Sequence, residues 1–552
     1  MLGFPFSRGS NPRVWIPLMK LTMALPRWFA LCAVLTPFLL RGAERPNILF
    51  IMTDDHAFHA LSCYGSKVNE TPGLDRIARE GARFANAFVV NSICTPSRAT
   101  LLTGKYSHAN GSPVFNRFNG AQDHVARRLR DSGYHTGMVG KWHLGSDPTG
   151  FDRWIVLPGQ GAYNNPAFLT PNGRLTVSGY ATDVITDLGI QFLETRPKDK
   201  PFFLMLHHKA PHRDWTPDPK NRARFKDKVI PEPPTLFDDY ATRPAALPEN
   251  HQTIARNLTH RDLKMEPPAE LKTPAERNKW WGVVPTEVAV TQPDGSVKTL
   301  TGKELTRWKY QRYMQDYLAC VQGVDDNMTR LLDHLDRTGL SKNTVILYTS
   351  DNGFFLGDQG MYDKRFMYEA SLRIPLLARW PGVTRPGTVP EGIALNADFA
   401  PTFLEIAGLP VPPEIHGRSL VPWLKGSAPA DWRTSMYYRY YHDPGHHNTR
   451  QHYGVRTRTH KLVHYSKKGA WELFDLVKDP QEQRNLIDDP AQAATVQQLK
   501  AELARLRKEL GDDDRFANDL PKDDVDGGFA DHGQLGERTA AQAIEASVDR
   551  KP

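Results

Sequence analysis

The chain has 552 residues, with 70 lysines and arginines against 62 aspartates and glutamates, and a formal net charge of +8. Five of these positive charges fall within the first 43 residues, where no acidic residue occurs, so the rest of the chain carries a net charge of only +3. Composition therefore gives no reason to expect a nucleic-acid partner. The length suffices for one large core and a satellite domain.

The N-terminus has the pattern of an export signal. Basic residues precede an apolar stretch from Phe29 to Leu40, and Gly42 and Ala43 offer small residues for cleavage. The stretch is too short to cross a bilayer comfortably. We therefore expect residues 1–43 to be a signal peptide, the protein to be exported to the periplasm or secreted, and no stable membrane span. A membrane anchor is the alternative.

Two apolar runs far apart in the chain, residues 47–53 and 344–350, indicate buried parallel strands. Each run ends in residues with side-chain oxygens, namely Asp54, Asp55, Asp351 and Asn352. Open α/β sheets bind ligands at the carboxyl ends of their strands. Hard oxygen ligands suit Ca²⁺ or Mg²⁺ better than zinc, whereas helix capping or a turn is the structural alternative.

The run Cys94-Thr95-Pro96-Ser97-Arg98 predicts a helix start at an anion site. Pro96 fits the first turn of a helix, where its missing N–H costs nothing. The helix start points unpaired amides and a partial positive charge at any anion in front of it. Arg98, about one turn along, can add a two-donor fork. The alternative is a buried structural cysteine beside an ordinary helix start.

A further run, Gly133 to His143, brings two polar residues together. Residues two apart in an extended segment point to the same face, so Lys141 and His143 can converge on one site. A surface lysine and a hydrogen-bonded histidine are the alternative. The apolar run 202–206 then leads into a histidine-rich turn that ends at His212.

The order of these segments predicts an α/β domain at residues 44–425, with amphipathic helices near 71–81, 123–132 and 310–336. The proline-rich, charged stretch 213–300 is either a surface excursion or the wall of a cleft. Short aromatic strands and a helix at 491–510 predict a small antiparallel sheet with a packed helix, within a C-terminal subdomain at 426–511. We expect a poorly packed tail at 512–552. Whether Cys63 and Cys320 pair is left open.

The run from Cys94 to Gly104 and the run from Gly133 to His143 resemble the two motifs of type I, formylglycine-dependent sulfatases. The resemblance implies an alkaline-phosphatase-like mixed sheet flanked by helices, and the smaller C-terminal sheet. It also implies that a maturation enzyme converts Cys94 to formylglycine, the nucleophile. The residues that it assigns to one Ca²⁺ are Asp54, Asp55, Asp351, Asn352 and residue 94. Those that it assigns to the sulfate and the leaving group are Arg98, Lys141, His143, His212 and Lys364.

Several segments look most like N-acetylglucosamine-6-sulfatases and their mucin- or glycosaminoglycan-desulfating relatives. They are residues 103–108, 208–212, 323–327 and 452–457. We therefore expect hydrolysis of a sulfate ester on carbohydrate, with 6-O-sulfated N-acetylglucosamine as the substrate. His452 is a candidate sugar contact. The zinc site suggested by His442, His446, His447 and His452 is not favoured, because no regular ligand spacing accompanies them.

Three other functions are weighed against this one. A sulfatase of another sulfated polysaccharide would keep the same chemistry. A phosphatase or phosphotransferase of the alkaline phosphatase superfamily would keep the carboxylates but use Ser or Thr with paired zinc. A non-catalytic sugar-binding protein is the third, and the occupied catalytic positions argue against it.

Overall fold

The computed structural model describes residues 14, 15, 17, 45–527 and 532–548. Almost all of the predicted signal peptide, residues 1–43, lies outside the described residues. From residue 45 onward the chain forms one compact unit. In the described parts of the chain, no helix combines the length and the apolar character needed to cross a bilayer.

The two predicted parallel strands lie side by side in the middle of a ten-stranded mixed sheet. They are β1 (Asn47–Thr53) and β11 (Thr344–Ser350), with the bounds that the sequence predicts. Thr53 pairs with Ser350, so both strands end at the same level of the sheet. The order across the sheet is β2 (Ala82–Arg83), β14 (Leu376–Arg379), β11, β1, β8 (Phe202–His207), β4 (His135–Lys141), β5 (Arg153–Leu157), β6 (Ala167–Thr170), β7 (Gly173–Thr176) and β20 (Gln534–Glu537).

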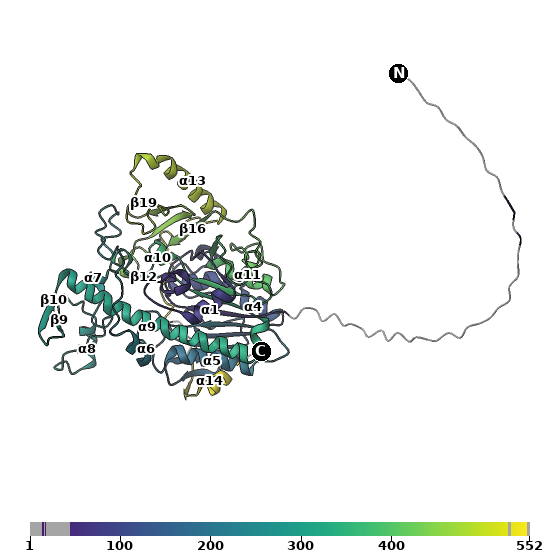
Figure 1. Cartoon of the computed structure of the whole chain (residues 1–552), viewed down its shortest axis with the longest axis horizontal. Helices are drawn as coiled ribbons and strands as arrows, with labels where there is room; N and C mark the ends of the chain where they lie inside the picture. The colour runs from purple at the N-terminus through teal and green to yellow at the C-terminus, as the bar shows by residue number, and fades with distance from the viewer. Residues whose placement is uncertain (1–13, 16, 18–44, 528–531, 549–552) are drawn as a thin grey trace, which may run out of the picture. The chain divides into compact units, whose positions relative to one another are not determined.

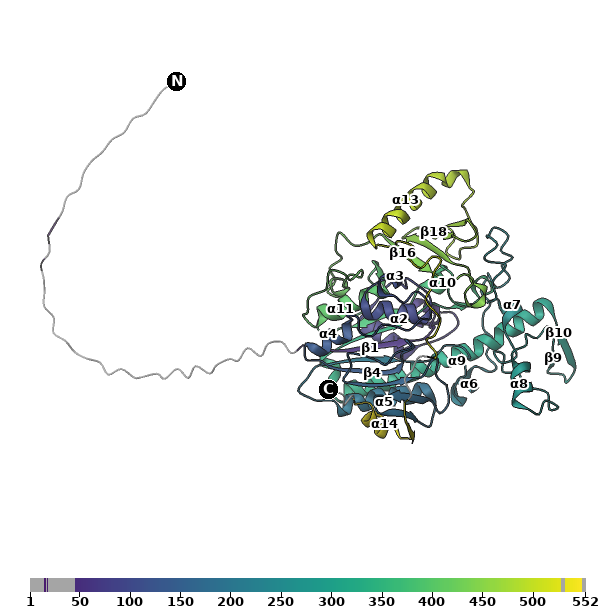
Figure 2. The ribbon, with the colours of Figure 1, turned by 180° about the vertical axis from the view of Figure 1, so that it is seen from behind.

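Side chains of the central strands alternate between two apolar cores, one on each face of the sheet. In β1, Phe50 and Met52 join the first core, and Leu49 and Ile51 join the second. The first core is covered by α2 (Cys94–Thr103), α4 (Val125–Asp131) and α11 (Phe399–Ile406), and the second by α1 (Pro72–Glu80), α5 (Ala181–Thr195) and α9 (Gly302–Arg337). Figure 2 shows α2 and α11 on one side of β1 and β4, and α5 and α9 on the other. The helices predicted near 71–81, 123–132 and 310–336 are α1, α4 and α9.

The C-terminal aromatic strands form a four-stranded antiparallel sheet, as predicted, with a helix packed on it (Figure 1). Its strands and helix are β16 (Ser435–Tyr440), β17 (His452–Thr457), β18 (His460–Tyr465), β19 (Ala470–Asp475) and α13 (Ala493–Glu509). Leu499, Leu503 and Leu506 are the buried residues of α13. The buried side chains Tyr437 and Tyr438 join the first core of the large sheet. The small sheet therefore shares a core with one face of the large sheet.

The stretch 213–300 is largely irregular. Its elements are α6 (Pro219–Phe225), α7 (Ile254–Asn257), α8 (Pro274–Trp281), β9 (Val288–Thr291) and β10 (Val297–Leu300). Among its described residues, only Arg213 lines the cavity that opens at the ends of β1 and β11. Trp215, Ile254 and Leu258 are buried in the second core, whereas most of residues 266–299 are exposed, so only the later part of the stretch is a surface excursion. Smaller elements elsewhere are β3 (Asn86–Phe88), α3 (Ser107–Asn110), β12 (Phe355–Leu356), β13 (Tyr362–Asp363), α10 (Glu369–Leu372), β15 (Ile393–Leu395) and α12 (Val421–Leu424).

The expectation of a poorly packed tail at 512–552 does not hold for several of its described residues. Asp512 is buried and pairs with Arg439 at 2.8 Å. β20 extends the large sheet beside β7, and Ile544 of α14 (Ala540–Ala546) is buried in the second core. Charge pairs and one short strand hold this segment, so a search for apolar periodicity does not find it.

The cysteines outside the predicted signal do not form a disulfide in the described structure. Cys63, Cys94 and Cys320 are all free. The backbone N–H of Cys63 donates to Oδ1 of Asp75 in α1 at 2.9 Å. Cys320 lies in α9, and its Sγ is 3.9 Å from the hydroxyl of Tyr180. The pairing that the sequence left open is therefore not formed.

Candidate active site

Three carboxylates converge at the carboxyl edge of β1 and β11. Asp54 and Asp55 follow β1, Asp351 follows β11, and oxygen atoms of the three lie within 4.8 Å of one another. The backbone N–H of Asp55 donates to Oδ1 of Asp351 at 3.1 Å. Nδ2 of Asn352 lies 3.4 Å from Oδ1 of Asp55. The four residues thus gather at one edge of the sheet, as their positions after the two strands predict.

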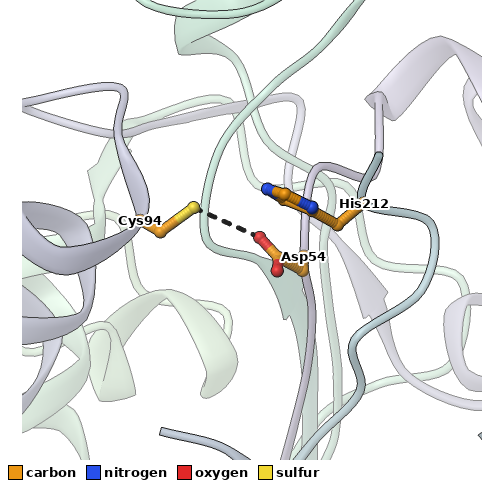
Figure 3. A group of neighbouring side chains, drawn as sticks. All are labelled: Asp54, Cys94 and His212. Atoms are coloured by element: carbon orange, nitrogen blue, oxygen red, sulfur yellow. Dashed lines mark hydrogen bonds between the residues drawn. The ribbon is translucent and has the colours of Figure 1, made fainter. Parts of the chain in front are cut away.

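Cys94 is the first residue of α2 and faces this cluster. Its Sγ lies 3.4 Å from Oδ1 of Asp54 (Figure 3) and 3.8 Å from Nδ2 of Asn352. Burial raises the pKa of the Cys94 thiol to about 12. The unmodified thiol is therefore protonated at neutral pH and is a poor nucleophile, since the thiolate is the reactive form.

Each carboxylate has a buried cation of its own. Lys141, at the end of β4, pairs with Asp54. Lys364 donates to Oδ2 of Asp55 at 2.5 Å. Arg98 donates to Oδ2 of Asp351 through Nε at 2.9 Å and Nη2 at 2.8 Å. All six side chains are buried. The cations offset carboxylate charge that would otherwise be costly to bury.

The carboxylate cluster fits a divalent cation with oxygen ligands. Burial, together with the charges of Asp351 and Asp363, raises the pKa of Asp55 to about 7 in spite of Lys364. Oδ1 of Asn352 is buried and has no hydrogen-bond partner among the described residues. Such an orphaned oxygen beside three carboxylates is a candidate metal ligand. Oxygen donors of this kind match Ca²⁺ or Mg²⁺.

His212 is the histidine of the turn after β8 that faces residue 94. Its ring lies with Asp54 and Cys94 in one group, whose ligand atoms are within 4.8 Å of one another (Figure 3). Nε2 of His212 is 3.7 Å from Oδ2 of Asp55, and Nδ1 donates to the carbonyl of Arg213 at 2.5 Å. Burial and the nearby lysines lower the pKa of His212 well below its ordinary value. In contrast, His207 bonds to the backbone of Lys141.

Lys141 and His143 do converge, through a residue that the sequence did not single out. Oε1 of Gln160 accepts from Nζ of Lys141 at 2.5 Å, and Nε2 of Gln160 lies 3.2 Å from Nε2 of His143. Nε2 of His143 also lies 3.2 Å from Oδ1 of Asp526. Nothing in the sequence marks Gln160 or Asp526, because the contact depends on the fold.

A cavity of about 570 Å³ opens onto the cluster, and Asp55, Cys94, His212 and Lys364 line it. Its walls come largely from three segments, in which sequence analysis assigned only Lys364 to the site. They are residues 363–365, residues 446–447 and residues 522–527. Asp363 and Arg365 flank Lys364 directly, so their adjacency in sequence was the available signal. Of the stretch 213–300 only Arg213 lines this cavity, whereas the C-terminal sheet contributes His446 and His447 from the loop between β16 and β17.

The expectation that His452 contacts the sugar is wrong in this structure. Its side chain is buried, and it is not among the residues that line the cavity. Nε2 accepts from the backbone N–H of Met367 at 3.1 Å, and Nδ1 bonds to the carbonyl of Arg450 at 2.8 Å. The ring stacks on Phe366 and on tyrosines of the C-terminal sheet. His452 is thus a core histidine that joins the sheet to the Lys364 loop.

The arrangement defines the class of protein. A mixed sheet that holds a helix N-terminus, a carboxylate cluster and three cations at its carboxyl edge is an alkaline-phosphatase-like hydrolase site for an oxyanion ester. The sulfatase family model matches residues 46–409. A second model, described as N-sulphoglucosamine sulphohydrolase, C-terminal, matches residues 357–509. The chain belongs to the sulfatase family and is a sulfuric ester hydrolase.

Known relatives cover most of the chain. An N-acetylglucosamine-6-O-sulfatase of Bacteroides thetaiotaomicron is 44% identical over 85% of this chain and 88% of its own. The human N-acetylglucosamine-6-sulfatase is 28% identical over 72% of this chain and 68% of its own. A solved structure described as a complex with its substrate D-glucosamine-2-N,6-O-disulfate has a TM-score of 0.80 and 42% identity. It covers 86% of this chain and 100% of its own.

Proposed function

We propose that this sulfatase removes the 6-O-sulfate of a glucosamine residue, with N-acetylglucosamine at a glycan end as the preferred form. The observation that carries the proposal is the cavity of about 570 Å³ that ends at residue 94, Asp55 and His212. The 44% identity to an N-acetylglucosamine-6-O-sulfatase supports the choice of sugar. A sulfatase of another sulfated polysaccharide remains the second candidate.

The nucleophile is formylglycine made from Cys94 by a maturation enzyme of the host. Two observations support this: Cys94 stands in the modification motif, and its own thiol is held neutral by burial. In the structure its Sγ takes the place of a hydroxyl oxygen of the hydrated aldehyde. A phosphatase of the same superfamily would need Ser or Thr at this position, so the residue type favours sulfate ester chemistry.

One Ca²⁺ binds at the carboxylate cluster. Asp54, Asp55, Asp351 and Asn352 would hold it together with the modified residue 94, and the orphaned Oδ1 of Asn352 supports this donor set. When bound, the ion supplies Lewis-acid stabilisation of negative charge on the sulfate oxygens and on the nucleophile. The positive charge of the ion would add to that of Arg98, Lys141 and Lys364 in attracting an anionic substrate.

The basic residues hold the sulfate and help the alcohol to leave. Arg98 and Lys141 supply positive charge next to residue 94, where negative charge builds up on sulfate oxygens. Nδ1 of His212 donates to a backbone carbonyl, so Nε2 is the atom that can carry a transferable proton. A bound sulfate anion favours the imidazolium form, because it opposes the effect of the nearby lysines. Lys364 stays charged and stabilises the departing oxygen.

Asp363 and Arg365 are the sugar-binding residues on the cavity wall. They form an ion pair of 2.6 Å, and both line the cavity. Nε of Arg365 is buried and has no hydrogen-bond partner in the described structure. The carboxylate can accept a hydrogen bond from one sugar hydroxyl, and the guanidinium can donate one to a neighbouring hydroxyl. The walls at 446–447 and 522–527 favour a chain end over the middle of a chain.

The proposal also covers the cellular location of the protein and its domain boundaries. We take residues 1–43 as a signal peptide on the sequence pattern, with export to the periplasm or secretion. Residues 44–425 form the catalytic domain, and residues 426–511 form the C-terminal subdomain. The partners are the sulfated carbohydrate and the maturation enzyme.

The test is sulfate release from a panel of sulfated monosaccharides and glycan oligosaccharides by the matured enzyme. We expect preference for 6-O-sulfated N-acetylglucosamine at a chain end. Arg365→Ala should raise KM for the sugar and leave KM for a small aryl sulfate nearly unchanged. A preference for 2-O-, 3-O- or 4-O-sulfated sugars would overturn the substrate assignment while leaving the sulfatase chemistry in place.

A further inference from the structure

The segment 512–527 returns from the C-terminal subdomain to the active site. The backbone N–H groups of Asp524 and Val525 both donate to the carbonyl of Phe115 at 3.0 Å. Asp523 pairs with Nε2 of His442 at 3.0 Å. These anchors place Asp526 at the cavity, with its Oδ1 3.2 Å from Nε2 of His143. A residue close to the C-terminus therefore contacts the catalytic motif at 133–143.

The two nitrogens of the His143 ring have different surroundings. Nε2 faces Asp526, whereas Nδ1 is buried and has no hydrogen-bond partner among the described residues. The backbone carbonyl of His143 accepts from Oγ1 of Thr95 at 2.9 Å, which fixes the residue next to position 94. The whole side chain is buried, so water does not exchange freely with either nitrogen. The proton position on this ring is therefore decided by protein groups.

Two neighbours of Nε2 favour opposite proton positions. Oε1 of Gln160 is taken by Lys141, so the amide nitrogen of Gln160 faces Nε2 of His143 at 3.2 Å and can only donate. Gln160 alone would favour a bare Nε2 with the proton on Nδ1. Asp526 can only accept, and it favours the proton on Nε2. A hydrogen bond to an ionised carboxylate is about twice as strong as a neutral one. The hydrogen bond from His143 lowers the pKa of Asp526, which keeps the carboxylate ionised.

We propose that Asp526 is a positioning residue that holds the ring proton of His143 on Nε2 and leaves Nδ1 as a bare acceptor. A bare Nδ1 can accept a hydrogen bond from the hydroxyl group of the modified residue 94, so this inference rests on the proposed function. Asp526 lines the cavity, and its effect on catalysis is exerted through Nε2 of His143. The C-terminal segment is thus part of the catalytic apparatus, because it sets the tautomer of a catalytic histidine.

The test compares Asp526→Asn and Asp526→Ala with Asp519→Asn in the full chain. Asp519 is an exposed aspartate of the same segment. The direct readout is ¹⁵N NMR of histidine-labelled protein, in which the His143 signals are those lost in His143→Gln. We expect the Nε2–H tautomer in the wild type and in Asp519→Asn, and a shift toward Nδ1–H in both Asp526 variants. This readout does not need residue 94 to be modified.

The second readout is kinetic. The Asp526 variants should lose about tenfold to a hundredfold in kcat, with KM within about twofold of the wild type, because general acid–base catalysis is impaired and binding is not. Asp519→Asn should match the wild type. An unchanged tautomer in both Asp526 variants, or an Nδ1–H tautomer in the wild type, overturns the inference. Wild-type enzyme that releases sulfate from no ester overturns the proposed function instead, since the NMR arm still reports on Asp526.

Discussion

Nζ of Lys364 donates a hydrogen bond of 2.5 Å to Oδ2 of Asp55, joining two residues that are 309 positions apart in the chain. The contact is buried, and it links the loop after β13 to the end of β1. Even with this cation in place, the pKa of Asp55 is raised to about 7, chiefly by burial and also by neighbouring carboxylates. Burial therefore disfavours the charged form of Asp55 even beside a lysine, and a bound metal ion would favour that form.

Loss of the nucleophile is expected to abolish turnover without unfolding the protein. Cys94→Ala should reduce sulfate release by more than about a thousandfold, a loss of ~4 kcal/mol in transition-state stabilisation. The melting temperature should stay close to that of the wild type. Mass spectrometry of the peptide with residue 94 should show formylglycine in active wild-type protein. Active protein in which this peptide has the mass of unmodified cysteine would falsify the assignment.

Calcium is expected to stabilise the fold by binding the native state. Addition of Ca²⁺ to chelator-treated protein should raise the melting temperature in a concentration-dependent way. Asn352→Ala should reduce this shift, since it removes the orphaned oxygen, whereas the exposed Asn164→Ala should not. A shift of equal size in Asn352→Ala and the wild type would place the ion elsewhere.

Replacement of His212 should matter most when the leaving group is a poor one. His212→Ala is expected to slow release from a sugar sulfate by about a hundredfold or more, because an alkoxide needs a proton as it departs. Release from 4-nitrophenyl sulfate should fall much less, since nitrophenolate leaves without one. Comparable losses with both esters would argue that His212 only shapes the site.

His452 is expected to matter for stability and not for sugar binding. His452→Ala removes a buried ring that stacks on Phe366 and Tyr438 and bonds to the backbone of Met367. The free energy of unfolding should fall by about 2–4 kcal/mol in a urea titration. KM for the sugar sulfate should be unchanged at a temperature where the variant is folded. A large rise in KM in the folded variant would restore the sugar-contact role.

Glu472 should make stability depend on pH. Burial raises its pKa from the ordinary carboxyl value to about 7, although Tyr368 and Tyr465 each donate to it at 2.9 Å. A carboxyl with a raised folded-state pKa binds more protons in the native state than in the unfolded state. Its contribution to stability is therefore complete below the unfolded pKa and is lost as pH rises through about 7.

The measurement is the melting temperature between about pH 5 and about pH 8. As pH rises, the melting temperature of Glu472→Gln should increase relative to that of the wild type, because the variant has no carboxyl to ionise at this position. Burial also raises the pKa of Glu482 to about 7, so some dependence should remain in the single variant. A profile that is identical in the two proteins would show that Glu472 does not titrate in this range.

The sequence by itself determined the central strands, the order of the motifs and which residues gather at the ends of β1 and β11. β1 and β11 have the predicted bounds because a buried parallel strand is apolar at nearly every position. Parallel strands in register end at the same edge of the sheet. The side-chain oxygens of the residues that follow β1 and β11 therefore lie close together. The helix start at Cys94 is local as well, because Pro96 and the following residues favour it in any context.

Only the tertiary structure decided the cavity walls and the supporting contacts. Asp526 and Gln160 reach His143 through segments whose sequences show no periodicity, so charge pairs and loop paths place them. His452 looked like a sugar contact for the same reason. The local sequence around a histidine in an aromatic strand does not show whether its ring faces a ligand or the core. Burial of that ring depends on contacts between residues far apart in sequence, and the strand's own pattern does not contain them.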